Sequence, residues 1–167
     1  LSFLELNPIY FEKWRQLYAA GIKATGIVGT DSHENVFPQT GSDGERLDAH
    51  RRMLRMMSNH VLVPDVSVSN VKTSIKNGAS WSVFEGLGSP VGMDFYAQVT
   101  DGDPVGPGST ITPSGLSTTI HVSLPKIYGV AQSSVDSNIR IELYRIAPDG
   151  DEKLVIETLD DDLEYET

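Results

Sequence analysis

The stretch from Ala24 to Glu34, ATGIVGTDSHE, constrains the fold most, because an apolar run, a glycine and two chemically active side chains follow one another. Ala24 to Val28 is small and apolar enough to predict a strand buried on both faces of a sheet. Gly29 and Thr30 end it by letting the backbone turn. Asp31 and His33 are therefore expected where a core strand opens, which is where ligands bind in α/β folds.

Asp31 and His33 form a candidate metal site. A carboxylate oxygen beside an imidazole nitrogen is a mixed ligand set that suits Zn, Mn or Fe. In an extended chain, side chains two residues apart point to the same side. Such a pair also arises by chance in loops, with the Asp as a turn former and the His at the surface. Spacing alone therefore leaves both interpretations open.

Charge and turn residues predict two units. Residues 1–99 carry ten acidic and nine basic side chains, whereas residues 100–167 carry thirteen acidic and four basic ones. The change falls at a turn-rich stretch, Asp101 to Gly108 (DGDPVGPG), that neither a helix nor a central strand tolerates. We expect an α/β unit over 1–99 and an acidic antiparallel β unit over 100–167.

Composition also disfavours or excludes several kinds of partner and site. Strong acidity in the second unit disfavours nucleic acid as a partner, because it repels phosphates. No apolar run is long enough to span a membrane. The chain has no cysteine, which excludes disulfides and thiolate metal sites.

The spacing of apolar residues, together with capping residues, prolines and glycines, predicts where the helices and strands lie. Asn7 as N-cap and Pro8 at the first turn begin a helix that Gly21 ends, and Ser67 and Gly78 bound a second one. The other elements expected in the first unit are a helix over 45–57 and strands over 59–63, 79–85 and 93–99. In the second unit we expect strands over 118–124, 139–146 and 153–157, the last two as a hairpin, and a solvated acidic end.

Arginines follow the metal motif closely and allow two interpretations. They could form the solvated face of an amphipathic helix, or one could grip a substrate phosphate, because a guanidinium matches phosphate oxygens in a fork. The candidates are Arg46, Arg51, Arg52 and Arg55. Glu34 is either a hydrogen-bond partner of His33 or an exposed loop acid.

The segment GIKATGIVGTDSH, with a helix before it and a long loop after it, resembles the last metal-binding segment of the PHP (polymerase and histidinol phosphatase) family. The usual form there is close to G-x-x-x-x-x-x-G-S-D-A-H, and Thr30 and Ser32 replace the common Ser and Ala. Val68 to Phe84 is similar to the family's closing helix and strand. The likeness covers roughly residues 1–99, and the β unit resembles the appendage of some exported bacterial proteins of this kind.

The resemblance implies a fold and an activity. The chain would be the C-terminal portion of a distorted (β/α)7 barrel, followed by a small antiparallel, sandwich-like β unit. Family members bind up to three metal ions and hydrolyse phosphoesters, with Asp31 and His33 as metal ligands. The substrate of the parent enzyme would be a phosphorylated small molecule, and the location periplasmic or extracellular in a bacterium. No catalytic residue is assigned.

The family's opening H-x-H motif and its middle Glu and His ligands are absent from these 167 residues. We therefore expect this piece to be inactive alone, and the missing part to be an N-terminal part of the same protein or a swapped copy. Two other interpretations stay open. The acidic β unit could be a carbohydrate- or surface-binding module, or the chain could be a structural remnant that has lost its chemistry.

Overall fold

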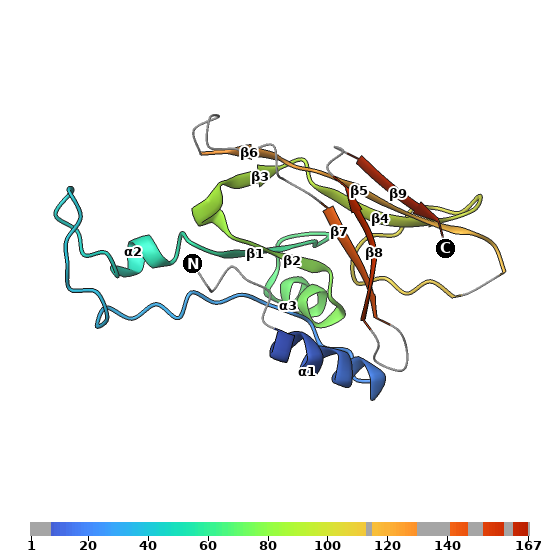
Figure 1. Cartoon of the computed structure of the whole chain (residues 1–167), viewed down its shortest axis with the longest axis horizontal. Helices are drawn as coiled ribbons and strands as arrows, with labels where there is room; N and C mark the ends of the chain where they lie inside the picture. The colour runs from blue at the N-terminus through green and yellow to red at the C-terminus, as the bar shows by residue number, and fades with distance from the viewer. Residues whose placement is uncertain (1–7, 113–114, 130–140, 147–151, 159–161, 167) are drawn as a thin grey trace.

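The computed structural model describes residues 8–112, 115–129, 141–146, 152–158 and 162–166, with only the backbone described over 152–158 (Figure 1). The elements are α1 (Pro8–Ala19), α2 (His50–Met53), β1 (Ser58–Val61), α3 (Val68–Asn77), β2 (Ser80–Val83), a 3-10 turn η2 (Glu85–Leu87), β3 (Ser89–Val91), β4 (Asp94–Val99), β5 (Thr118–Ser123), β6 (Lys126–Tyr128), β7 (Ile141–Ile146), β8 (Glu152–Thr158) and β9 (Asp162–Glu166).

Helix α1 confirms the predicted helix, although its expected cap Asn7 lies outside the described residues. Gly21, with φ 74°, ends the helix in the left-handed conformation that glycine adopts freely. The ring of Trp14 lies over Gly26, and its indole N–H donates to the carbonyl of Ala24 at 2.8 Å. The helix therefore covers the start of the segment that leads to Asp31.

Helix α3 and the strands beside it form an antiparallel unit. The Ser67 hydroxyl accepts from the backbone N–H of Asn70, and Gly78 ends the helix with φ 79°, as predicted. The chain reverses at once after Gly78, so that the N–H of Leu62 donates to the carbonyl of Ala79 at 2.9 Å. Strand β2 consequently pairs with β1 in antiparallel register.

A three-stranded sheet, in the order β4-β5-β9, dominates the second half of the chain. Tyr96, His121 and Glu164 lie in one cross-strand row on its polar face. Leu163 lies on the opposite face and is 5% exposed. The acidic C-terminal residues expected to be a solvated end thus form an edge strand, because Leu163 is buried while the acids alternate toward water.

Two smaller pairs complete the described part of the chain. Strand β3 pairs with β6, and β7 pairs with β8 across a register shift between Leu143 and Tyr144. The β7-β8 pair confirms the predicted hairpin, although its turn lies outside the described residues. The rings of Phe11 and Tyr144 meet edge to face at 5.7 Å, so this hairpin lies against α1.

The prediction of a (β/α)7 barrel portion is wrong. Such a barrel needs parallel neighbouring strands, whereas every strand pair in the described residues is antiparallel, and these residues form no closed barrel. Residues 24–28 are not a strand, and Ile27 is 63% exposed. An apolar run becomes a buried strand only where other strands pair with it, and the described residues offer it none.

The helix predicted over 45–57 is reduced to the four residues of α2. Residues before it form a turn instead, in which Gly41 N–H donates to Glu45 C=O and Thr40 bridges Arg46. The Asp48 side chain binds backbone groups of the preceding loop rather than arginines one turn further along, so the helical pattern of charges is not realised.

The stretch expected to link two units packs against the first of them. Val105 exchanges two backbone hydrogen bonds with Ala97, and the Lys23 ammonium donates to the carbonyl of Gly108 at 3.0 Å. A Cβ on Gly108 would lie 2.7 Å from Asn77 O and from Ala79 N. This stretch is therefore not a flexible linker. The division of the chain into two domains stays a prediction.

Gly108→Ala should lower the free energy of unfolding by about 1–3 kcal/mol more than Gly92→Ala, because overpacking against fixed backbone adds to the strain. Gly92 is the matched control, since its φ of 82° is close to the 83° of Gly108 and a Cβ there meets nothing within 4 Å. Urea denaturation of both variants measures the difference. Equal losses would contradict the close packing of Gly108 against the α3-β2 turn.

Candidate functional site

Asp31 and His33 lie on an exposed loop at the end of a long segment that runs out from α1 (Figure 1). Asp31 has φ 46°, a left-handed conformation that Asp tolerates better than most residues. The positive φ turns the chain here without a strand before it. The chain thus turns at Asp31 through its own backbone conformation and not at the end of the strand that the sequence predicted.

The two predicted metal ligands point toward one another. Asp31 Oδ2 and His33 Nε2 are 3.8 Å apart, and the side chains are 96% and 51% exposed. Neither side chain is in a core or on an opposite face. The same-side orientation expected from two-residue spacing is therefore present, although the strand that was to produce it is not.

Asn35, which the sequence analysis did not single out, orients the His33 ring. The Asn35 Oδ1 atom lies within hydrogen-bond distance of His33 Nδ1. Since a carbonyl oxygen only accepts, the proton in this contact is on Nδ1, and in the neutral form of the ring Nε2, the atom that faces Asp31, is then free to act as a donor to a metal ion. The sequence offered no signal for this contact beyond an amide side chain close to the histidine.

Glu34 acts on the neighbouring helix α2. Its Oε1 accepts from the backbone N–H of His50 at 3.1 Å, and its carbonyl accepts from Arg46 at 2.9 Å. The Ser32 hydroxyl lies 2.8 Å from His50 Nδ1. Glu34 and Ser32 therefore tie the loop to α2. Of the two interpretations of Glu34, the exposed loop acid is the one that the structure matches, and Asn35 contacts the His33 ring instead.

Asp48 is the buried centre of this loop, at 2% exposure. Its carboxylate accepts from both Arg46 nitrogens, at 2.8 and 2.9 Å, and from the N–H groups of Val36 and Phe37, at 2.9 and 2.7 Å. The Arg46 guanidinium, and then these two N–H groups, hold the pKa of Asp48 well below its usual range. One ionised side chain thus fixes the loop after His33 against the turn before α2.

Three of the four candidate phosphate-binding arginines are paired with acids of the same loop. Arg46 binds Asp48, while Arg51 and Arg52 both contact Glu45, and Arg52 also binds Asp43. The Arg51 hydrogen bond lowers the pKa of Glu45, so this acid stays ionised. Arg55 is exposed, and its guanidinium makes no hydrogen bond or ion pair to the described residues. It is the candidate whose guanidinium is not already neutralised.

The other histidines belong to satisfied local networks. Glu85 accepts from Ser58 and Ser89 and lies 3.3 Å from His60 Nε2. His121 stacks on Tyr96, with ring centroids 4.5 Å apart, and lies 3.2 Å from Glu164. Both networks join neighbouring strands or a strand to η2, which is a structural role.

Over the described ranges, no group of three or more His, Cys, Asp or Glu side chains is placed to hold a metal ion. Asp31 and His33 are thus a pair of donors and not a full coordination sphere. No helix in this part of the chain is long and apolar enough to cross a membrane.

Comparison with known proteins gives no relative. No family model matches the chain, and neither the curated proteins nor the solved structures contain a significant match. The chemistry of the site therefore has to be argued from the loop itself.

Asp48→Asn should release the loop at neutral pH. The pKa of Asp48 is lower in the folded state than in the unfolded state, so its stabilisation is fully present above the unfolded-state pKa of about 3.9 and is lost progressively as the pH falls from there toward the lower folded-state pKa. We expect amide exchange protection of Val36 and Phe37 to drop in the wild type on acidification from pH 6 to pH 3, and to be low at both pH values in the variant. Protection measured by NMR tests this.

The control is Asp65→Asn, because the Asp65 carboxylate is exposed and makes no hydrogen bond or ion pair to the described residues. Asp65→Asn should keep the protection of the wild type at pH 6. Protection of Val36 and Phe37 that survives in Asp48→Asn would show that Asp48 does not hold this loop.

Proposed function

We propose that this chain supplies Asp31 and His33 as two ligands of a divalent metal centre, with Zn, Mn or Fe as the ion, in an enzyme that hydrolyses phosphoesters. The observation that carries the proposal is the approach of His33 Nε2 to Asp31 Oδ2, a nitrogen and an oxygen donor that lie 3.8 Å apart on one exposed loop. Two electron-rich atoms held face to face on an open loop attract a cation.

The donor set fits a metal ion. Zinc binds imidazole nitrogen and carboxylate oxygen at about 2.0–2.2 Å, so one ion can reach two donors that are 3.8 Å apart. A partner that fixes the tautomer of a ligating histidine is a usual companion of such sites, and Asn35 supplies it. The exposure of both side chains leaves room for further ligands.

A divalent ion bound here would lower the pKa of a bound water and polarise a phosphoryl oxygen, which is the chemistry that phosphoester hydrolysis requires. The choice of phosphoesters as substrates comes from the resemblance of the motif to the PHP family. Arg55 adds a basic side chain with no acidic partner among the described residues, suited to an anionic substrate.

Two protein ligands are too few for a tight site, so we propose that the remaining ligands come from another segment that pairs along residues 24–28. In the described structure, Thr25, Gly26 and Ile27 make no backbone hydrogen bonds. Such unpaired backbone beside an exposed apolar side chain is a template for an added strand. An upstream part of the same protein or a swapped copy would supply it.

His33→Ala should abolish binding of Mn²⁺ or Zn²⁺ to the chain, and Asn35→Ala should weaken it by about tenfold or more, since loss of a supporting partner costs that much. The ion binds weakly even in the wild type, because water would fill most of its coordination sphere. Titration of Mn²⁺ followed by the electron paramagnetic resonance signal of the free ion measures this. His121→Gln is the control, because its ring lies on β5 and should leave binding unchanged. Binding that persists in Asp31→Asn/His33→Ala would contradict the assignment.

The purified chain by itself should hydrolyse no aryl phosphate above background with Mn²⁺ or Zn²⁺ present. Two protein ligands do not position an ion, a water and a phosphoryl group together. The measurement compares the chain with His33→Ala at matched metal concentrations. Robust turnover that vanishes in His33→Ala would show that the chain already holds a complete site, and the proposed need for a partner would fall.

A further inference from the structure

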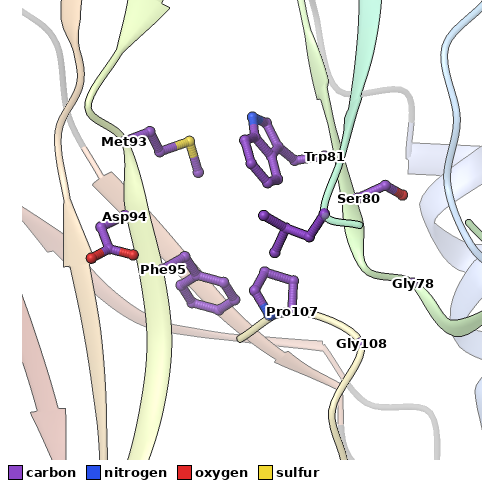
Figure 2. Close-up of a pocket in the computed structure, with 9 residues that line it drawn as sticks. Gly78, Ser80, Trp81, Met93, Asp94, Phe95, Pro107 and Gly108 are labelled. Carbon is purple, nitrogen blue, oxygen red and sulfur yellow. The ribbon is translucent and has the colours of Figure 1, made fainter. Parts of the chain in front are cut away.

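A concave site lies between the β1-β2 pair and β4, and neither Asp31 nor His33 lines it. The cavity has a volume of about 370 Å³. Trp81, Phe95 and Pro107 converge on it from three different parts of the chain (Figure 2). Its full lining is Leu62, Gly78, Ser80, Trp81, Met93, Asp94, Phe95, Pro107 and Gly108.

The walls of this cavity are apolar because of strand alternation. Met93 and Phe95 extend into it from β4 and the turn before it, whereas the Asp94 carboxylate points away from it (Figure 2). On β2, Trp81 faces the cavity and the Ser80 hydroxyl is directed away (Figure 2). The cavity therefore presents an indole, a phenyl ring, a thioether and two aliphatic groups, with no charged side chain directed into it.

The cavity is open to a ligand. Met93 is 41% and Phe95 is 37% exposed, so solvent reaches both side chains. Gly108, with φ 83°, fits its backbone against Asn77 and Ala79 and closes one end. A volume of about 370 Å³ is near the lower end of the range of about 300–1,000 Å³ typical of small-molecule sites.

We propose that this cavity binds a neutral, planar aromatic molecule of one or two fused rings. Flat aromatic walls and a methionine sulfur make favourable contacts with the faces and edges of such a ring. A charged group would lose its hydration without gaining a partner. An anion is further disfavoured by the nearby Asp94 and by the net charge of −10. The site shares no residue with the Asp31 loop, so it is independent of the proposed metal centre.

The test uses the full chain carrying Trp14→Phe, which leaves Trp81 as its one tryptophan, and as probe the neutral, planar, two-ring dye 7-methoxycoumarin, whose absorption overlaps tryptophan emission. Binding in the cavity should quench Trp81 emission by energy transfer, saturably and with one probe per chain. Dye fluorescence that rises without saturable quenching of Trp81 would mean that the dye adheres to other apolar surface, and would overturn the proposal.

Two lysine substitutions separate the cavity from the rest of the apolar surface. Met93→Lys replaces the thioether with a hydrated ammonium group at the cavity wall and should weaken probe binding at least about tenfold, because the apolar probe would have to displace that hydration. Met56→Lys is the matched control, since Met56 is 37% exposed and does not line the cavity, and it should bind the probe as the parent does. Equal affinity of the two lysine variants would overturn the proposal.

Phe95→Leu gives a second measurement of probe binding that introduces no charge. It keeps an apolar side chain but removes an aromatic contact, which should weaken probe binding by about two- to tenfold. Circular dichroism and Trp81 emission without the probe establish that each variant is folded. Unchanged affinity in a folded Phe95→Leu chain would show that the ring is not part of a binding site.

Discussion

The side-chain amide of Asn59 is the contact on which the position of the Asp31 loop depends. Its Oδ1 accepts from the N–H of Val28 at 2.9 Å and its Nδ2 donates to the carbonyl of Val28 at 2.8 Å, as a neighbouring strand would do. Among the described residues, these are the only hydrogen bonds to the backbone between Ala24 and His33. The Asn59 side chain of β1 thus makes with Val28 the two hydrogen bonds that a neighbouring strand would make. The N–H and C=O groups of Thr25, Gly26 and Ile27 have no backbone partner among the described residues.

Beyond that contact the loop is held by charge rather than by a core. Asp48 and Ala49 are the buried residues in this region, and Asp48 is buried as an ionised group that accepts four hydrogen bonds. The same acids that order the loop also neutralise most of its arginines. A loop built in this way can present Asp31 and His33 in a fixed orientation while offering few free cations to a phosphate, which leaves anion attraction to Arg55 and to any bound metal.

Local signals predicted local structure well, and long-range pairing was where sequence reasoning failed. Ser67 and Gly78 bound α3 because a cap is decided by atoms within one turn. The apolar run before Asp31 was assigned to a barrel strand on composition, but a strand is fixed by its neighbours, and the described residues supply only Asn59. Strand β9 was not predicted, because its acidic composition is typical of a solvated end. Pairing with β5 nevertheless buries Leu163. Of the site, the approach of Asp31 to His33 was expected from side-chain alternation along a strand, but residues 24–33 form no strand and Asp31 has φ 46°, so alternation does not account for it.

The described residues supply all the walls of the aromatic cavity but only two ligands of the proposed metal site. The reason is the backbone that holds each site. The aromatic cavity is enclosed by β2, β4 and the Pro107-Gly108 turn, and each of these is fixed by its own backbone pairing or close packing. The metal pair lies at the end of a segment whose backbone is open on the side away from Asn59. An added strand there would bring its own side chains beside Asp31 and His33, because residues at the ends of neighbouring strands lie side by side. Backbone pairing and completion of the metal site would then be one event, and metal affinity would report on whether residues 24–28 are covered.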